Sequence, residues 1–343
     1  MKCSWLSHLW FLLLVMCCTG LKAENGYDLW LRYPLITETS LRNTYIKQLA
    51  SIKLTGQSPT LIAAREELLR GLEGLTGRRF TISNTTSRVA PGLVIGNASN
   101  DQGLKQLVSR ELLRECGPEG YLITTTKTGP FRIIITANSD IGVLYGVFHF
   151  LRIIQTKQSL TTIHIVSAPR LKLRLLNHWD NLNRTVERGY AGFSIWNWHT
   201  LPYYIDQRYI DYARANASIG INGTVLTNVN ANATILTPAY LLKVKALADV
   251  FRPYGIKVYL TARFSAPIES GGLKTADPLN EEVRQWWKNK AKEIYSLIPD
   301  FGGFLVKANS EGQPGPQDYK RTHADGANML AEAVAPFNGI IIW

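Results

Sequence analysis

The sequence predicts an α/β protein: a small N-terminal α+β domain followed by a truncated (β/α)8 TIM barrel, represented by its first four to five βα units. Helical and strand-like segments alternate irregularly up to about residue 168, whereas from Lys172 short apolar runs alternate regularly with helical segments. Successive βα units indicate parallel strands. No glycine-rich phosphate loop follows any predicted strand, so a barrel is favoured over an open nucleotide-binding sheet.

The first 23 residues have the pattern of a signal peptide. Lys2 precedes an apolar run from Leu9 to Cys18, and cleavage is expected after Ala23. Lipidation at Cys17 or Cys18 is a weaker alternative, because the residues before these cysteines match a lipidation signal poorly. No later segment approaches about 18 consecutive apolar residues. We therefore expect an exported protein, periplasmic or extracellular, with no membrane span.

Charge and cysteine content limit the classes of partner. The formal charge of +12 becomes +10 when Lys2 and Lys22 leave with the signal, since no acidic residue precedes Glu24. No Lys/Arg run or nucleic-acid motif accompanies this charge, so we expect no nucleic-acid binding and interpret it mostly as solvated surface, with a few cations available for an acidic ligand. Of four cysteines only Cys116 remains in the mature chain, which excludes an internal disulfide and a cysteine metal site.

Residues 24–168 are predicted to form the α+β domain. Gly77 is expected to end its second helix, and Ser139 is expected to cap its last one. No catalytic constellation is visible, and His149 is more typical of a packing position than of a ligand. The predicted helices are Thr39–Leu54, Pro59–Leu75, Gly103–Glu115 and Ile141–Ile154, and the predicted strands are Phe80–Ser83, Leu93–Ile95, Tyr121–Thr126 and Arg132–Ala137.

Residues 169–343 are predicted to form the first part of the barrel. A complete barrel takes about 250 residues, and 172 run from Lys172 to Trp343. We therefore expect this chain to be the front portion of a longer protein. The predicted strands are Lys172–Asn177, Thr224–Asn228, Lys257–Thr261, Phe304–Lys307 and Gly339–Trp343, and the predicted helices are Gln207–Ile219, Pro238–Tyr254, Asn280–Leu297 and Asp325–Ala335.

Polar side chains follow each of the first four barrel strands, at the edge where barrel active sites lie. The stretches are Asn177–Asn181, Asn228–Asn232, Arg263–Glu269 and Lys307–Glu311. Amides form paired hydrogen bonds to hydroxyls, and an indole face stacks on a sugar ring. These residue types therefore predict a carbohydrate site, with Trp179 a member of the site rather than of the core.

Several of these residues have a structural alternative. Asparagines after strands are often turn formers, which leaves Asn228, Asn230 and Asn232 at about even odds. Trp286 and Trp287, in mid-helix, are expected to be packing residues. A group of aromatic side chains in the first loop could be loop core or a substrate wall, and the wall is slightly favoured: Tyr190, Phe193, Trp196, Trp198, Tyr203 and Tyr204.

The catalytic chemistry is expected to depend on carboxyl groups. His178, His199 and His323 lack metal-ligand spacing, so we expect neither a metal nor a cofactor. Glycosidases use one protonated carboxyl group as general acid and a second that acts on water or on the sugar. Glu311 is the best candidate for the acid. The spacing leaves its partner open among Asp180, Glu269 and Asp318.

Five stretches resemble glycoside hydrolase family 67, the xylan-debranching α-glucuronidases, and the resemblance covers nearly all of the mature chain. The stretch from Lys307 to Pro316 is the specific one. The others are Tyr27-Asp-Leu-Trp-Leu-Arg-Tyr33, Leu176-Asn-His-Trp-Asp-Asn-Leu182, Tyr190-Ala-Gly-Phe-Ser-Ile-Trp196 and Gly220-Ile-Asn-Gly-Thr224. The resemblance implies an inverting enzyme that removes (4-O-methyl)glucuronic acid from xylo-oligosaccharides, and it allows a homodimer of the full-length protein.

The resemblance also implies roles for individual residues. Glu311 matches the general acid, Lys307 a cation that receives the uronate carboxylate, and Trp179 an aromatic at the sugar site. Asp180, Asn228 and Asn309 are added as candidate substrate-binding residues. The family's base carboxylates belong to later strands, so we expect this chain to be inactive by itself. A retaining barrel glycosidase and a non-catalytic carbohydrate-binding protein remain as alternatives.

Overall fold

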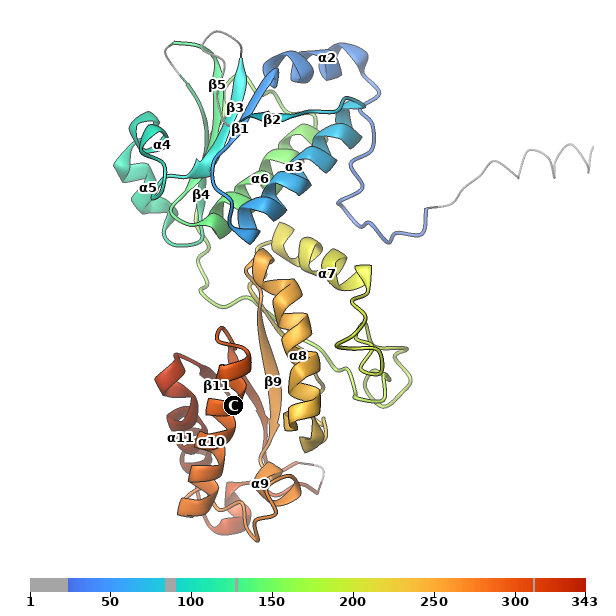
Figure 1. Cartoon of the computed structure of the whole chain (residues 1–343), viewed down its shortest axis with the longest axis vertical. Coiled ribbons are helices and arrows are strands. Elements are labelled where there is room, and N and C mark those ends of the chain that lie inside the picture. The colour runs from blue at the N-terminus through green and yellow to red at the C-terminus, as the bar shows by residue number, and fades with distance from the viewer. Residues whose placement is uncertain (1–23, 84–90, 127–128, 311) are drawn as a thin grey trace, which may run out of the picture. The chain divides into compact units, whose positions relative to one another are not determined.

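The computed structural model describes residues 24–83, 91–126, 129–310 and 312–343 (Figure 1). The predicted signal peptide and the predicted general acid Glu311 lie outside these residues. The chain forms two compact units, one ending at Arg32 and one running from Tyr33 to Trp343, and each is described by itself. In the first unit Arg32 pairs with Glu24. None of the helices in the described ranges has the length and apolar character needed to cross a membrane.

The second unit contains two separate sheets. The N-terminal sheet has six strands in the order β2-β1-β3-β5-β4-β6. Strands β2, β1, β3 and β5 are parallel, whereas β4 runs antiparallel to both β5 and β6. Its strands are β1 (Ser51–Leu54), β2 (Ile82–Ser83), β3 (Gly92–Asn97), β4 (Tyr121–Thr125), β5 (Arg132–Ala137) and β6 (His164–Ser167).

Helices α3 (Pro59–Thr76) and α6 (Asp140–Gln155) pack against each other, and α6 also packs on the sheet (Figure 1). The caps at Gly77 and Ser139 follow the sequence prediction, whereas the cap at Ser58 was not predicted. The Ser58 hydroxyl accepts a hydrogen bond from Leu61 N, the Ser139 hydroxyl accepts one from Gly142 N, and Gly77 ends α3 at a φ of 70°. The remaining helices of this part are α2 (Thr39–Gln48), α4 (Gln102–Leu107) and α5 (Arg110–Cys116).

Two predictions for this part were wrong, and one strand was missed. The expected helix Thr39–Leu54 ends at Gln48, because Ile52 and Leu54 are buried in a strand between β2 and β3. The expected helix Gly103–Glu115 is two helices, since the Ser109 hydroxyl caps a new one by accepting from Glu111 N. Strand β6 was not predicted at all.

The second sheet consists of five parallel strands in the order β11-β10-β9-β8-β7. Each strand therefore neighbours the one before it in the chain, without the reversal of order found in doubly wound sheets. The sheet curls into a half-barrel and confirms the predicted βα alternation. The strands are β7 (Leu175–Asn177), β8 (Gly223–Val225), β9 (Lys257–Arg263), β10 (Gly303–Lys307) and β11 (Ile340–Ile342).

The helices between these strands bury an extensive hydrophobic cluster. Trp287 of α10 is fully buried and meets Phe304 of β10 with ring centroids 5.9 Å apart, while Trp286 is half-buried, so the predicted packing role is confirmed. The helices are α7 (Gln207–Ser218), α8 (Pro238–Phe251), α9 (Ala266–Glu269), α10 (Glu281–Leu297) and α11 (His323–Val334), with short 3-10 helices at Ala233–Leu236, Arg252–Tyr254, Pro316–Tyr319 and Ala335–Phe337.

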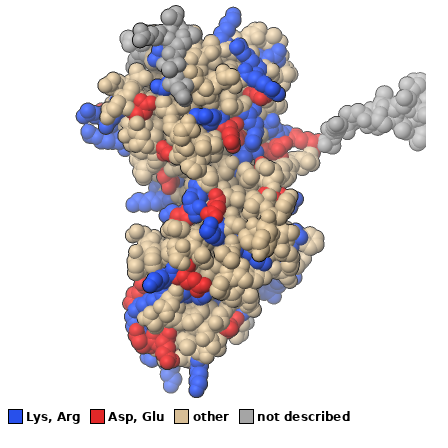
Figure 2. Space-filling model, in the orientation of Figure 1, with Lys and Arg blue, Asp and Glu red and all other residues tan. Residues whose placement is uncertain are grey.

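Most charged side chains lie on the surface, where both signs are mixed. Figure 2 shows Lys and Arg interspersed with Asp and Glu over the face in view. An exception joins α3 to α7: Glu67 and Arg214 are 2% and 8% exposed. Arg214 donates to Glu67 from Nε at 2.7 Å and from Nη2 at 3.0 Å, and the Tyr33 hydroxyl donates to the same carboxylate at 2.7 Å. This buried ion pair therefore connects α3, in the part with the N-terminal sheet, to α7 of the half-barrel.

Removing one charge of this pair should destabilise the protein strongly. We expect Glu67→Gln to lower the free energy of unfolding by about 1.5–3 kcal/mol, because buried Arg214 would lose its two-point carboxylate partner and keep only the ion pair with Asp211 at 2.9 Å. The matched control is Glu73→Gln, which breaks an exposed pair with Arg79 at 3.0 Å and should cost no more than about 1 kcal/mol. Urea unfolding measures both values, and equal small losses would contradict the structural role of the pair.

Candidate functional site

A cavity of about 460 Å³ opens where β7, β8 and β10 end. The carboxyl ends of parallel strands meet at one edge of a sheet, which is why segments far apart in the chain contribute to it. Two of the predicted site residues, Trp179 and Lys307, line this cavity. The described residues that line it are Trp179, Glu187, Arg188, Val229, Asn230, Val306, Lys307, Ala308 and Ser310.

Lys307 is the last residue of β10 and only 6% of it is exposed. Its ammonium group donates a hydrogen bond to the side-chain oxygen of Asn230. A buried ammonium group is tolerated only where polar partners replace its water shell. The strand end therefore holds a positive charge at the wall of the cavity, with an asparagine from the neighbouring strand end beside it.

Asn230 is held in place by its neighbours. Its backbone N–H donates to Asn228 Oδ1 at 2.9 Å, and its carbonyl accepts from Arg263 Nη2 at 2.9 Å. Asn228 is 1% exposed and does not line the cavity. Asn228 therefore makes a turn contact and its substrate-binding assignment stays a prediction, whereas Asn230 reaches the cavity. The Asn-x-Asn spacing after the strand was the available signal for Asn230.

Trp179 and Asp180 are adjacent in sequence but face different surroundings. Trp179 is 45% exposed and lines the cavity, whereas Asp180 is 3% exposed and does not. Asp180 Oδ2 lies 3.2 Å from His178 Nδ1, and His178 Nε2 lies 2.8 Å from the Tyr212 hydroxyl. The substrate-binding assignment of Asp180 stays a prediction, and the structure places its carboxylate in a buried polar chain behind the cavity wall.

Tyr212 continues that chain to β8, with its hydroxyl 2.9 Å from Thr224 Oγ1. Burial raises the pKa of the Tyr212 phenol far above its usual value, and the Asp180 charge adds to the rise, although the Thr224 hydrogen bond opposes it. The phenol is therefore neutral under ordinary conditions and acts as a hydrogen-bonding group only.

Asn309 follows β10 with a φ of +51° and donates from Nδ2 to Gln317 Oε1 at 2.9 Å. It is not among the residues that line the cavity. Gly315 packs against it so closely that an added Cβ would lie 2.6 Å from Asn309 N, which explains the glycine in this loop. The contact folds the loop after β10 back on itself on either side of the predicted acid position.

The carboxylates considered as partners of Glu311 all have structural contacts. Glu269 Oε2 lies 3.1 Å from Arg263 Nη1, and Asp318 Oδ2 accepts from Gly315 N at 2.8 Å. Asp180 belongs to the chain with His178. In the part of the chain that the structure describes, no group of three or more His, Cys, Asp or Glu side chains is arranged to hold a metal ion.

The aromatic residues of the first loop divide into two sets. Trp196 and Trp198 are fully buried, so the substrate-wall prediction was wrong for them. Trp196 packs against Tyr212 and Phe251 with ring centroids 5.0 and 5.6 Å apart, because a large apolar indole gains most by joining the core behind the loop. The other four are exposed, but none lines the cavity: Tyr190, Phe193, Tyr203 and Tyr204.

Comparison with known proteins identifies the family of this chain. The model of the glycosyl hydrolase family 67 middle domain matches residues 153–343, and that of the family 67 N-terminus matches residues 29–150. The chain belongs to glycosyl hydrolase family 67. Together the two matches cover every strand of the N-terminal sheet and the whole half-barrel, including Trp179 and Lys307.

Named relatives of this family 67 chain are fungal. "Alpha-glucuronidase A" of Emericella nidulans is 40% identical over 333 residues, covering 94% of this chain and 38% of the relative. "Alpha-glucuronidase" of Hypocrea jecorina is 36% identical over 345 residues, covering 97% of this chain and 40% of the relative. The chain thus spans about two fifths of the length of the curated relatives it matches.

Two solved structures share the fold of this family 67 chain. One is a GH138 enzyme targeting pectin rhamnogalacturonan II, with a TM-score of 0.56 at 16% identity, covering 84% of this chain and 41% of that one. The other is a family GH115 4-O-methyl-α-glucuronidase, with a TM-score of 0.53 at 12% identity, covering 84% of this chain and 39% of that one. At these identities the likeness concerns the fold alone.

The neighbours Trp179 and Asp180 should respond to substitution in opposite ways. We expect Asp180→Ala to lower the free energy of unfolding by about 1–3 kcal/mol, because it removes the partner of Nδ1 on the half-buried His178. Trp179→Ala removes an exposed side chain and should change stability by no more than about 0.5 kcal/mol, while weakening any sugar bound in the cavity. Chemical denaturation and a binding titration of both variants separate the roles, and a stable Asp180→Ala protein would refute the supporting role.

Proposed function

We propose that the whole protein is an α-glucuronidase that removes (4-O-methyl)glucuronic acid from xylo-oligosaccharides during xylan degradation. Membership of family 67 and the names of the relatives support a glycoside hydrolase of this kind. One observation supports the proposed class of substrate: the buried Lys307 lies in the wall of a cavity that also presents the exposed indole of Trp179. An ammonium group suits a uronate carboxylate, and the Trp179 face suits a sugar ring.

The proposed mechanism is inverting, with Glu311 as the general acid that protonates the leaving oxygen. Inversion needs a second carboxylate about 6.5–9.5 Å away to activate water on the opposite side of the ring. In family 67 this base belongs to strands after those described above, so we propose that residues 24–343 alone do not turn over substrate. Support for Glu311 comes from its position in the sequence, four residues after Lys307.

The proposal also covers the architecture of the whole catalytic domain and the cellular location of the protein. We propose that the half-barrel is the first part of a complete (β/α)8 catalytic barrel, because its strands are parallel and in sequential order. The signal-peptide pattern of residues 1–23 supports export to the periplasm or the extracellular space.

Substitution of Lys307 tests the proposed substrate class. We expect Lys307→Met in the full-length protein to reduce kcat/KM for a glucuronic-acid-substituted xylo-oligosaccharide by about a hundredfold or more, because a charge-assisted hydrogen bond to the carboxylate is lost. The control is Lys288→Met on α10, an exposed lysine outside the cavity, which should leave kcat/KM unchanged. Equal turnover by both variants would rule out uronate recognition at Lys307.

Substitution of Glu311 tests whether the site is catalytic. In the full-length protein, Glu311→Gln should abolish turnover of the same substrate while retaining its binding, because the amide cannot donate the proton that the leaving oxygen needs. A protein that only binds carbohydrate would show neither turnover before the change nor a loss after it. Rapid kinetics with a released-sugar assay, combined with a binding titration, distinguishes the two.

A further inference from the structure

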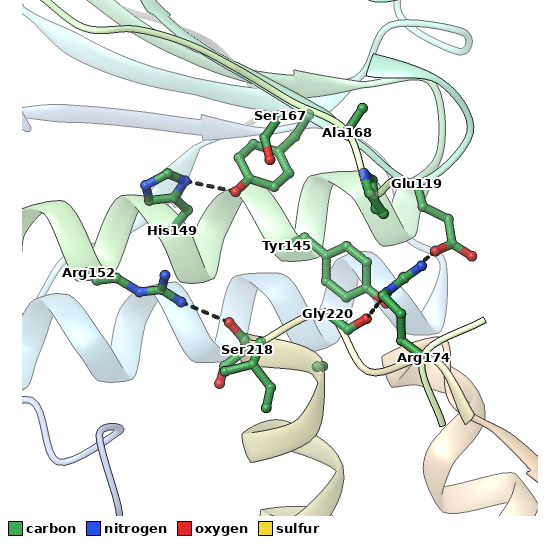
Figure 3. A pocket seen from close by; sticks show the side chains of 13 residues that line it. Glu119, Tyr145, His149, Arg152, Ser167, Ala168, Arg174, Ser218 and Gly220 are labelled. Atoms are coloured by element: carbon green, nitrogen blue, oxygen red, sulfur yellow. Dashed lines mark hydrogen bonds and ion pairs between the residues drawn. The ribbon is translucent and has the colours of Figure 1, made fainter. Parts of the chain in front are cut away.

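A second cavity, of about 330 Å³, lies on the other side of the half-barrel from the strand ends that carry Lys307, next to the C-terminal end of α7. Helix α6 contributes Tyr145, His149 and Arg152, whose spacing of four and three residues places them on one face of the helix. Figure 3 shows Arg152 reaching Ser218 at the end of α7, Tyr145 beside Arg174 and Glu119, and His149 on the side of α6 near Ser167. Sequence analysis had interpreted His149 as a packing residue.

The two arginines in this cavity have different partners. Arg174 pairs with the Glu119 carboxylate and also donates to the carbonyls of Gly220 and Leu171, so its charge is matched. Arg152 donates from Nη2 to Ser218 O at 3.1 Å, which is a neutral partner. Among the described residues no carboxylate forms an ion pair with Arg152. The cavity therefore carries one guanidinium whose positive charge is not matched by an adjacent anion.

The remaining polar groups of the cavity are neutral. Burial lowers the pKa of His149, and the Arg152 charge lowers it further. Its Nδ1 lies 2.7 Å from the Tyr121 hydroxyl, whose pKa is raised by burial. Tyr145 is 6% exposed, and burial together with the Glu119 charge raises its pKa to about 12. At neutral pH these side chains therefore supply neutral hydrogen-bonding groups around a single unmatched cation.

We propose that this cavity is a binding site for a small hydroxylated monocarboxylate, of the class of the hexuronic acids. One guanidinium can receive one carboxylate, and the surrounding phenol, imidazole and Ser167 hydroxyl can bond to sugar hydroxyls. The volume lies at the lower end of the roughly 300–1,000 Å³ typical of ligand pockets, which suits a single sugar ring rather than a chain. That glucuronic acid itself is the ligand rests on the proposed function.

The test is titration calorimetry on the full-length protein with D-glucuronate, in a Lys307→Met background that removes the strand-end cavity as a second uronate site. We expect saturable binding of glucuronate and at least about tenfold weaker binding of D-glucose, acetate and inorganic phosphate. Glucose has the ring without the carboxylate, acetate has the carboxylate without the hydroxyls, and phosphate is an anion without either.

Variants then locate the binding. In the same background, Arg152→Gln should weaken glucuronate at least about tenfold, while Arg208→Gln should leave it unchanged, because Arg208 is an exposed arginine at the opposite end of α7. Since Arg152 also contacts Ser218, Tyr145→Phe serves as a milder second variant. It removes one oxygen atom and should weaken glucuronate severalfold without affecting the fold.

A spectroscopic readout reports on the cavity directly. A carboxylate bound beside His149 opposes the effect of Arg152, so glucuronate should raise the His149 pKa, measured from the imidazole proton signals and assigned with His149→Gln. Binding without a change in that pKa would overturn the proposal, as would equal binding of glucose or phosphate, or binding indifferent to Arg152→Gln. If glucuronate binds the unmodified protein but not the Lys307→Met protein, the proposed binding site in the second cavity is refuted. The same result would support uronate recognition at Lys307 and so the proposed function.

Discussion

Parallel pairing of β7 through β11 is the constraint on which the candidate active site depends. Strands that run in one direction deliver their carboxyl ends to one edge, so residues separated by more than a hundred positions share a cavity. The pairing of Lys307 with Arg263 across β10 and β9 places two basic residues at that edge. Asn230 then contacts both of them, accepting from Lys307 with its side chain and from Arg263 with its carbonyl.

Behind the cavity, a buried set of polar contacts positions the residues that line it. Asn228 N donates to Asp180 O at 2.8 Å, and the Asn228 side chain accepts from Asn230 N. The ends of β7 and β8 are thereby tied together by hydrogen bonds that water does not reach. Trp179 and Asn230 can be held at the surface because their neighbours Asp180 and Asn228 are anchored inside. A site built this way depends on residues that never meet a ligand.

Basic side chains have different kinds of partner in three parts of the protein. Arg214 is neutralised by Glu67 between α3 and α7, and Arg174 by Glu119 beside the end of α7. Such pairs offset the cost of removing each charge from water. Arg152 contacts a carbonyl instead, and Lys307 has an amide oxygen among its contacts. Lys307 and the exposed Arg152 each line a cavity that an anionic ligand can enter, whereas Arg174 lines the second cavity with its charge matched by Glu119.

The sequence by itself determined the type of nearly every element and the residues most suited to an acidic sugar. Spacing and caps are local properties, so α3, α6 and the parallel βα units could be predicted with small errors at their ends. Lys307 and Trp179 stood out because each follows a strand. The Glu311 assignment comes from motif alone and lies outside the described residues.

Tertiary structure decided everything that depends on which neighbours a segment meets. The apolar spacing of Ser51–Leu54 predicted a helix, yet these residues form strand β1 because β2 and β3 pair with them on either side. Trp196 and Trp198 became core and Asn230 became cavity wall for the same reason, since burial is a property of the surroundings rather than of the residue. His149, interpreted from sequence as a packing residue, lies three residues from Arg152 on α6, and the approach of α7 and Arg174 makes both part of the wall of a second cavity.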